Sequence, residues 1–248
     1  MSRYFRMLER AARDNELGPA VSGTAPYSAH RRRPRSLEGL MREEITKLVQ
    51  RVFLLPDDGV APRAVVFSGL QHSDASSWIC ARAGQALARQ GTSTVCLVDA
   101  NLRSPSLYTH LGVENQPGLV DALFQTGPIH DYAQSITGAN LWIVPSGGSA
   151  TPDAYTQLGG KLMQSCLAEL RARFNYLLIN APPADLYADA AVVGKLVDGI
   201  ILVVEANSTR RETTKQAKES LDTANVKILG AVLDKRTFPI PEAVYRRL

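Results

Sequence analysis

Unbroken apolar runs that alternate with helical stretches constrain the fold of this chain more than any other feature of its sequence. Six such runs predict strands, at residues 63–68, 94–99, 140–145, 175–180, 199–205 and 227–233. Strands that are apolar along most of their length are buried on both faces, which is typical of parallel strands joined by right-handed crossovers. The pattern therefore predicts an α/β fold with a doubly wound, mostly parallel sheet and helices on both faces.

Helical stretches separate several of these strands, and helices are expected at residues 75–90, 154–173, 186–197 and 210–224. A further helix is expected from an N-cap at Ser36 up to Pro56, because apolar residues recur there at helical spacing. In doubly wound sheets the ligand binds beyond the carboxyl ends of the strands. Functional residues are therefore expected in the loops that follow the strands.

The chain of 248 residues is long enough for one such domain and a short extension. Residues 1–16 are expected to form a short amphipathic helix, residues 17–36 a basic flexible linker, and residues 37–248 the α/β domain. Residues 1–36 hold eight arginines against three acidic residues, so this arm carries the basic excess. The arm is either a solvated linker or a contact for an anionic membrane surface or an acidic partner. Nucleic acid is not favoured, because no aromatic residues are interleaved with a basic face.

Cysteine usage and hydropathy bear on the cellular compartment. Cys80, Cys96 and Cys166 lie in apolar stretches without metal-ligand or disulfide spacing, so buried reduced thiols are expected. No stretch approaches the roughly 18–20 apolar residues that a membrane span needs, and the N-terminus lacks the apolar core of a signal peptide. The sequence predicts a cytoplasmic protein, with a peripheral position at the inner face of the membrane as an option.

Residues 68–77 occupy the place of a phosphate-binding loop. They lie between the first apolar strand and a helix, where a P-loop of the form G-x-x-x-x-G-K-[ST] is found. Ala75 stands where the lysine of that motif would reach the phosphates, and Asp74 puts a carboxylate where a polyanion would lie. Ser73 and Asp74 are also favourable N-cap residues, so the altered loop can simply begin its helix.

Longer stretches of the chain resemble the P-loop bacterial tyrosine kinases (BY-kinases) of capsule and exopolysaccharide export, which are relatives of the MinD/ParA ATPases. The resemblance covers residues 36–248 and includes VDANLRSPSL from Val98, INAPPADLYADAAVVGKLVDGIILVVEANSTRR from Ile179 and ILGAVLDKR from Ile228. It implies an ATP site with a Walker A lysine, a Walker A′ motif D-x-D-x-R and a Walker B aspartate. It also implies kinases that phosphorylate their own C-terminal tyrosines and form rings regulated by a membrane-bound partner.

Three chemical positions of that family are replaced in this chain. The Walker A lysine becomes Ala75, the second Walker A′ aspartate becomes Asn101, and the Walker B aspartate becomes Asn180. Mg²⁺ prefers carboxylate and water oxygens, and phosphoryl transfer depends on neutralising charge, so these losses remove what the reaction needs. Asn180 can instead satisfy buried hydrogen bonds without the cost of a buried charge. The replacements predict a nucleotide site that no longer supports Mg²⁺ binding and phosphoryl transfer.

Other positions of the vestigial nucleotide site keep polar residues. Asp99 is the best remaining catalytic candidate, or it is structural, capping a helix or pairing with Arg103. If Mg²⁺ binds, the resemblance assigns Ser76 and Asp99 as its ligands. The remaining candidate nucleotide-binding residues are Ser73, Ser76, Ser77, Arg103 and Asp234, the last standing where the family offers an asparagine to adenine. Trp78 is expected to fill the core or cover a narrowed pocket.

The C-terminal part lacks the tyrosine-rich tail that the resemblance implies. Tyr245 is the only tyrosine after Tyr187, so it is the possible single phospho-acceptor, with packing on the domain as the alternative. The oligomerisation helix of the family carries a glutamate followed by two arginines, with three residues from each to the next. Glu44, Lys47 and Gln50 fill those places here, so a homo-oligomer is possible but not specified.

These observations lead to one leading hypothesis and two alternatives. The leading hypothesis is a pseudokinase or scaffold of exopolysaccharide synthesis and export that binds no cofactor and docks to a membrane polysaccharide co-polymerase or an active kinase. The first alternative is an active tyrosine kinase that uses ATP and Mg²⁺ with an atypical phosphate loop. The second is a partitioning ATPase of the MinD/ParA type, which the missing lysine weakens. An iron–sulfur scaffold is disfavoured because paired cysteines are absent.

Overall fold

A computed structural model of the chain describes residues 37–55, 59–71, 73–90, 93–124, 127–136, 138–148 and 151–235. The helix expected at residues 1–16, the basic linker at residues 17–36 and the candidate acceptor Tyr245 lie outside the described residues. The expectations for these segments therefore stay predictions.

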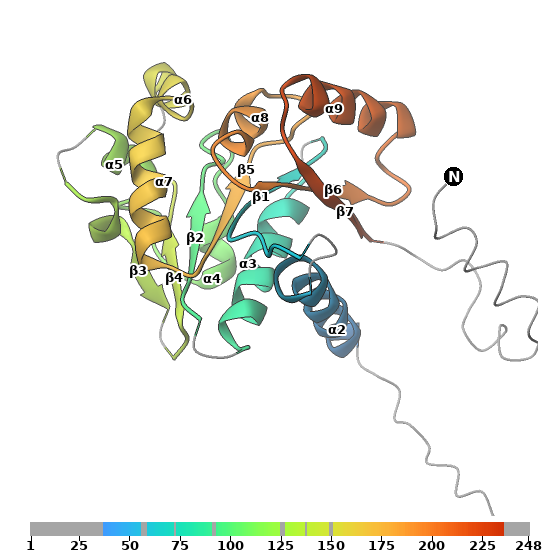
Figure 1. The fold of residues 1–248 in the computed structure, drawn as a ribbon, viewed down its shortest axis with the longest axis horizontal. Helices are drawn as coiled ribbons and strands as arrows, with labels where there is room; N and C mark the ends of the chain where they lie inside the picture. Colours follow the sequence, from blue (N-terminus) through green and yellow to red (C-terminus); the bar gives the residue numbers. More distant parts are fainter. Residues whose placement is uncertain are drawn as a thin grey trace, which may run out of the picture. The chain divides into compact units, whose positions relative to one another are not determined.

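The strands of the described residues form one sheet in the order β3-β4-β2-β5-β1-β6-β7 (Figure 1). They are β1 (Ala64–Gly69), β2 (Val95–Asp99), β3 (Gln134–Ile136), β4 (Leu141–Val144), β5 (Tyr176–Ala181), β6 (Gly199–Glu205) and β7 (Ile228–Asp234). Neighbouring strands are parallel, except that β3 is antiparallel to β4. Every residue of β1 and β2 is buried, as their apolar runs predict. The mostly parallel sheet is thus confirmed.

Helices cover both faces of this sheet (Figure 1). One face packs against α2 (Leu37–Val49), the π-helical turn η1 (Gln50–Leu54), α3 (Ala75–Ala88) and α4 (Leu107–Leu111). The other packs against α5 (Leu119–Phe124), the 3₁₀ turn η2 (Ile129–Tyr132), α6 (Pro152–Gln157), α7 (Lys161–Arg173), α8 (Asp189–Gly194) and α9 (Arg211–Thr223). This arrangement is the predicted doubly wound fold.

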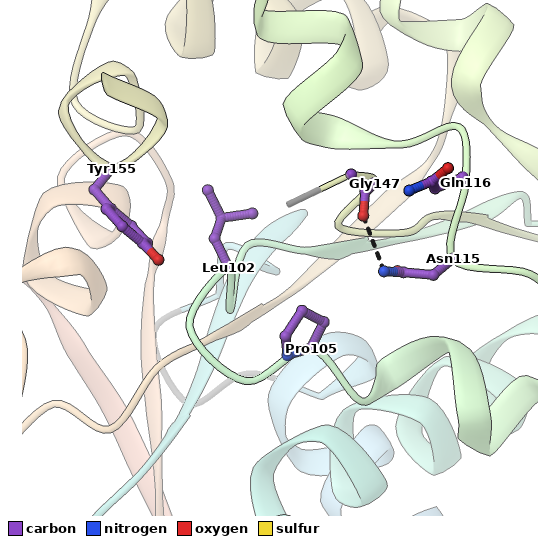
Figure 2. Close-up of a pocket in the computed structure, with 7 residues that line it drawn as sticks. Leu102, Pro105, Asn115, Gln116, Gly147 and Tyr155 are labelled. Carbon is purple, nitrogen blue, oxygen red and sulfur yellow. Dashed lines mark hydrogen bonds between the residues drawn. The ribbon is translucent and has the colours of Figure 1, made fainter. Parts of the chain in front are cut away.

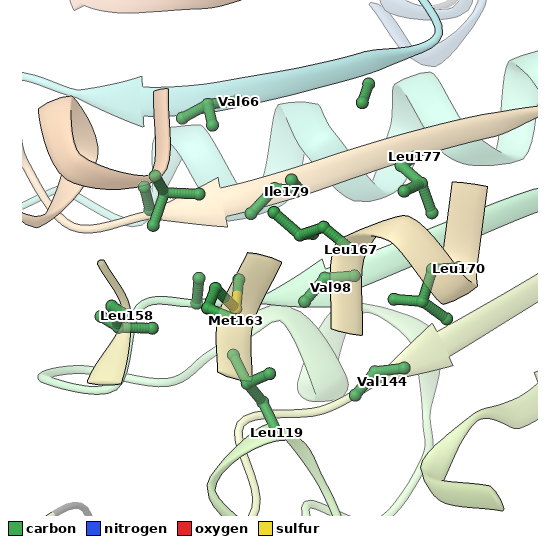
Figure 3. Close-up of a cluster of buried hydrophobic side chains, with 14 of the residues drawn as sticks. Val66, Val98, Leu119, Val144, Leu158, Met163, Leu167, Leu170, Leu177 and Ile179 are labelled. Atoms are coloured by element: carbon green, nitrogen blue, oxygen red, sulfur yellow. The ribbon is translucent and has the colours of Figure 1, made fainter. Parts of the chain in front are cut away.

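Each face of the sheet has its own apolar core, because successive side chains of a strand point to opposite faces. Val65 of β1 belongs to the core beneath α3, and its neighbour Val66 belongs to the core beneath α7. Figure 3 shows the second core, in which Met163 and Leu167 of α7 lie over Val98 of β2. Packing on both faces fixes the strands, and therefore the loops at their carboxyl ends.

The prediction of one helix over residues 154–173 is wrong. The structure has two helices there, α6 and α7, with a turn at residues 158–160 between them. Gly160 is the N-cap of α7 and has extended backbone angles, φ −83° and ψ 175°. A helix cannot continue through an extended residue, and glycine is unfavourable within helices. The pair Gly159–Gly160 was the sequence signal for this break.

Other differences concern short elements. The strand β3 and the helices α4 and α5 were not expected, because three to six residues are too few to show a periodicity. The helix expected up to Pro56 is α-helical only to Val49 and continues as the π-helical turn η1. Trp78 is half-buried, packs against the core beneath α3 and lies under the guanidinium of Arg82, so it is partly core filler, as expected.

The three cysteines are free, and Cys80 and Cys96 are buried as expected, whereas Cys166 is half-buried. Within the described part of the chain, no helix combines the length and the apolar character that crossing a membrane requires.

Leu97 offers a test of this packing, because it lies in the interior strand β2 with no exposed surface and contacts α3 at Gly84. We expect Leu97→Ala to lower the free energy of unfolding by about 2–5 kcal/mol, through lost apolar burial and the cavity that remains. Urea denaturation measures this loss. Leu162→Ala on α7, where the side chain is 49% exposed, is the matched control and should change stability by less than about 0.5 kcal/mol. Equal losses in both variants would contradict this placement of the core.

Candidate functional site

The carboxyl ends of β1, β2 and β5 bring the sequence-predicted residues together. β5 lies between β1 and β2, and its Asn180 is in register with Phe67 of β1 and Asp99 of β2. Because adjacent parallel strands point their side chains the same way at paired positions, Asp99 and Asn180 become neighbours. The backbone N–H of Ala100 also donates to the carbonyl of Asn180, at 2.9 Å. The sheet itself therefore builds the centre of the candidate site.

Asp99 is fully buried and accepts four hydrogen bonds. The amide of Asn180 donates to Oδ1 at 2.9 Å, and the backbone N–H of Asn101 donates to the same oxygen at 3.2 Å. The backbone N–H groups of Ser106 and Leu107 donate to Oδ2, at 3.3 and 3.1 Å, where α4 begins. The sequence offered two structural roles for Asp99, capping a helix or pairing with Arg103. Its bonds to the backbone at the start of α4 correspond to the first role.

Burial raises the pKa of Asp99 from 3.8 to about 6, although its four hydrogen-bond donors each lower it. A fully buried carboxylate loses its hydration, which favours the neutral form, and hydrogen bonds to the charged form compensate only in part. Asp99 therefore titrates near neutral pH without facing solvent.

Asn180 is satisfied on one side only. Its Nδ2 donates to Asp99, but its Oδ1 is buried and has no hydrogen-bond partner among the described residues. The hydrogen bond to Asp99 agrees with the expectation that Asn180 satisfies buried hydrogen bonds, whereas its Oδ1 accepts none from the described residues. Asn101 is fixed more completely, since its Oδ1 accepts the backbone N–H of Ser104 at 3.2 Å and closes the turn after β2.

Arg103 does not pair with Asp99, so this alternative was wrong. Its Nε donates to Asp189 Oδ2 at 2.7 Å, and its Nη2 lies 3.3 Å from Oδ1 of the same residue. The guanidinium carbon lies 4.3 Å from the ring centre of Tyr155 and 4.1 Å from that of Tyr187. A charge held by a carboxylate and by two aromatic faces is neutralised in place. Asp189, Tyr155 and Tyr187 were not expected here, because they are close to Arg103 only in space.

The start of α3 carries a network that we call the Asp74 cluster, made of Asp74, Ser77, Ser106 and His110. The hydroxyls of Ser77 and Ser106 both donate to Asp74 Oδ1, and the two hydroxyl oxygens lie 2.8 Å apart. His110 Nε2 lies 2.8 Å from Asp74 Oδ2. Partial burial raises the pKa of Asp74, but the hydrogen bonds from Ser106 and Ser77 and the nearby His110 outweigh this and lower it.

The Asp74 cluster does not have the geometry of a Ser-His-Asp triad. A triad places the carboxylate on one imidazole nitrogen and the hydroxyl on the other. Here both Asp74 and Ser77 approach Nε2 of His110, at 2.8 and 3.4 Å. Asp74 is the N-cap residue of α3 by position, yet its side chain makes no capping bond to the backbone. The cluster instead ties α3 to α4.

The remaining residues of the altered loop are held by the chain itself. Ser73 Oγ accepts the backbone N–H of Ala75 at 3.2 Å, and Ser76 is buried against Gly69. The backbone N–H of Gln71, whose φ is +65°, donates to Asp185 Oδ1 at 2.8 Å. A carboxylate of this protein therefore binds a backbone N–H in the loop where a P-loop would bind phosphate. Sequence reasoning missed Asp185.

Asp234 lies outside this group of residues. It ends β7, which is separated from β1 by β6, and its backbone carbonyl accepts the N–H of Ala206 at 2.9 Å. The neighbouring Lys235 pairs with Glu205. Among the sequence-predicted residues, the structure brings Asp99, Asn101 and Asn180 into one network and links it through Ser106 to the Asp74 cluster.

These residues do not fit Mg²⁺ with a triphosphate. Ala75 supplies no cation for the phosphates, and the carboxylate of Asp74 lies at the N-terminus of α3. Both oxygens of Asp99 are already taken by N–H donors, whereas Mg²⁺ needs free oxygen ligands. No group of three or more His, Cys, Asp or Glu side chains in the described segments is arranged to hold a metal ion.

Sequence comparison identifies relatives of this chain among the bacterial tyrosine kinases. It is 29% identical to tyrosine-protein kinase YwqD of Bacillus subtilis over 172 residues, which cover 69% of this chain and 72% of the relative. It is 26% identical to tyrosine-protein kinase CpsD of Streptococcus agalactiae over 178 residues, 71% of this chain and 76% of the relative. No protein-family model matches the chain.

Solved structures of the same fold include a chimerical protein, a kinase domain and a ParA family ATPase. The chimerical protein CapA2B2 superposes with a TM-score of 0.74 at 22% identity, covering 84% of this chain and 88% of that one. The VpsO kinase domain superposes with a TM-score of 0.71 at 23% identity, covering 81% of this chain and 98% of that one. A ParA family ATPase from Chlorobium tepidum superposes with a TM-score of 0.56 at 17% identity, covering 71% of this chain and 75% of that one. At these identities the structures establish the shared fold.

The raised pKa of Asp99 has a consequence for stability. Because the folded state holds the proton more tightly than the unfolded state, protonation stabilises the fold, and this contribution is lost as pH rises through about 6. We expect the stability of the wild type, relative to Asp99→Asn, to increase by about 1–2 kcal/mol between about pH 7.5 and about pH 5. Urea denaturation of both proteins at the two pH values measures it. A difference that does not vary with pH would contradict the assignment.

The Asp74 cluster is expected to couple α3 to α4 energetically. In a double-mutant cycle of Asp74→Ala and His110→Ala, we expect a coupling energy of about 0.5–1 kcal/mol, kept small because the Asp74 side chain is 57% exposed. Chemical denaturation of the two single variants and the double variant gives this value. A control cycle of Asp74→Ala with His130→Ala, a histidine that pairs with Glu169 instead, should be additive within about 0.5 kcal/mol. Additivity in both cycles would show that the contact contributes nothing.

Proposed function

Because this chain is a homologue of the bacterial tyrosine-protein kinases and has their fold, we propose that it is a degenerate member without kinase activity. In this proposal it acts as a regulatory or scaffold protein of exopolysaccharide or capsule biosynthesis and export. The fold is kept because it presents surfaces to partners, and the nucleotide chemistry is lost.

One observation carries the proposal: side chains of this protein bind the polar groups of the altered loop. Asp185 accepts the loop N–H of Gln71, and Asp74 is bound by two hydroxyls and His110. Binding a triphosphate there would place its charge beside the Asp74 carboxylate, with no lysine to offset the repulsion. Loss of one charge-stabilising group typically costs a factor of about 10²–10³ in rate. Several replacements in one site support the loss of activity.

The partner in this proposal is a membrane polysaccharide co-polymerase or a related active kinase. The chain matches 23% of the length of tyrosine-protein kinase wzc of Salmonella typhi, a relative that contains much further sequence. We infer that the domain described here needs such a partner for its role, and that the basic residues 1–36 bring it to the inner face of the membrane. A homo-oligomer through the helix that holds Glu44 and Lys47 is compatible with this role.

An active kinase is the second candidate, and the unpartnered Oδ1 of Asn180 favours it. A buried acceptor without a donor is unfavourable, and a water molecule or a bound ligand would satisfy it. In that case ATP would be the phosphoryl donor and Tyr245 the acceptor, and Asp99 would have to release some of its N–H donors before it and Ser76 could hold Mg²⁺. The ParA-like fold alone supports the third candidate, a partitioning ATPase.

Calorimetric titration with Mg-ATP and Mg-ADP tests the proposal. We expect no binding by the wild type, because no cation faces the phosphates and Asp74 repels them. The variant Asp74→Gly, Ala75→Lys, Asn101→Asp, Asn180→Asp restores the groups that the family uses. It should bind Mg-ATP with a Kd in the range of about 1 μM to 1 mM.

Circular dichroism of both proteins controls for the fold. Micromolar binding of Mg-ATP by the wild type would overturn the proposal. Incubation with radiolabelled ATP, and with Tyr245→Phe as the comparison, would then decide whether the chain is a kinase.

A further inference from the structure

A cavity of about 390 Å³ lies beside the altered loop without including it (Figure 2). It is formed where the loop after β2, the segment before α5 and the loop after β4 approach α6. Its lining residues are Leu102, Pro105, Asn115, Gln116, Gly147, Gly148 and Tyr155. Its size lies within the range of roughly 300–1,000 Å³ that small-molecule sites occupy, and it opens at the carboxyl edge of the sheet.

One wall of this cavity is held by a closed set of hydrogen bonds. The amide of Asn115 donates to the carbonyl of Gly147 at 2.9 Å, as Figure 2 shows, and accepts the hydroxyl of Ser146 at 2.9 Å. The N–H of Gly147 donates back to the carbonyl of Asn115 at 3.0 Å. A Cβ on Gly118 would lie 2.4 Å from the backbone nitrogen of Gly147, so only glycine permits this approach. The wall is therefore fixed in the absence of any ligand.

The opposite wall is the side chain of Tyr155, which lies across Leu102 from Gly147 (Figure 2). Its ring packs on the guanidinium of Arg103, which also contacts the ring of Tyr187 and pairs with Asp189. The aromatic ring is thus oriented by groups outside the cavity. A site whose walls are fixed in advance loses less entropy when it binds a ligand.

The chemistry of the lining selects the ligand. None of the seven lining residues is charged, and the nearby Arg103 is neutralised by Asp189, so an anionic group gains little here. Leu102 and Pro105 form an apolar surface. The hydroxyl of the half-buried Tyr155 and the amide of the exposed Gln116 bond to no other described residue, so both can donate to and accept from a ligand. The cavity therefore offers an apolar wall and unoccupied neutral hydrogen-bonding groups.

We propose that this cavity binds a neutral polyhydroxylated ring, with its C–H face on Leu102 and Pro105 and its hydroxyls on Tyr155 and Gln116. Such a ring is the pentose of a nucleoside or the hexose of a glycan, and the two share the chemistry that the cavity recognises. This site is separate from the altered phosphate loop, so it does not depend on whether the loop binds ATP.

The test uses the whole protein with two sets of probes that carry no phosphate. Methyl glucoside, galactose and N-acetylglucosamine represent the glycan source, and adenosine and uridine represent the nucleoside source. We expect saturable binding of one set, with a Kd of about 1 mM or tighter by calorimetry. Backbone amide resonances of Gly147 and Gly148 should shift on titration, whereas those of residues 73–77 should not.

Variants localise the binding. Tyr155→Phe and Gln116→Ala should each weaken it about threefold to tenfold, as expected for the loss of one hydrogen bond. The matched controls are Tyr132→Phe and Gln216→Ala, which lie outside the lining and should leave the affinity unchanged. Binding of the sugars would identify the ring as the hexose of a glycan, and binding of adenosine or uridine would identify it as the pentose of a nucleoside. The proposal is overturned if neither set binds at about 10 mM, or if Tyr155→Phe and Gln116→Ala both bind as the wild type does.

Discussion

The buried carboxylate of Asp99 is the interaction on which the rest of the candidate site depends. It accepts the amide of Asn180 from β5 and backbone N–H groups from the turn after β2 and from the start of α4. One side chain thus joins two strands to a helix that is too short to be stable alone. Ser106 begins that helix, and through its hydroxyl the arrangement reaches Asp74 and the altered loop. A carboxylate that holds the fold in this way has no oxygen left for a metal ion.

The altered loop satisfies its polar groups with acceptors from within the chain. A P-loop binds phosphate through backbone N–H groups at a helix N-terminus, and these groups need an acceptor whether or not a nucleotide is present. Here Asp185 and Ser73 each accept one of the N–H groups of the loop, and the hydroxyl of Ser77 is bound to Asp74. Internal acceptors remove the requirement for an external anion. The loop can then keep its path without its lysine.

Arg103 connects this region to the cavity beside it. Its charge is held by Asp189, and its guanidinium contacts the rings of Tyr155 and Tyr187. The residue that resembles the Walker A′ arginine of the family is therefore used to orient an aromatic wall. Within the described residues, the Oδ1 of Asn180 is buried without a hydrogen-bond partner, and the cavity is lined by neutral polar side chains. Of these two places, only the cavity is an open space with fixed walls.

The sequence by itself determined the sheet, both layers of helices, the position of the altered loop and the similarity to bacterial tyrosine kinases, because these depend on long apolar runs and on ordered stretches of many residues. It also placed Asp99, Asn101 and Asn180 at one edge, since parallel strands share their carboxyl ends. It did not find the break at Gly160, the strand β3 or the short helices, whose local patterns are too brief to read.

Only the tertiary structure decided which groups pair. Asp189 lies 86 residues from Arg103 in the chain, and Asp185 lies 114 residues from Gln71. His110 meets Asp74 only because Asp99 fixes the start of α4. Such contacts follow from strand order and register, which place distant side chains within hydrogen-bond distance and leave no trace in the local sequence.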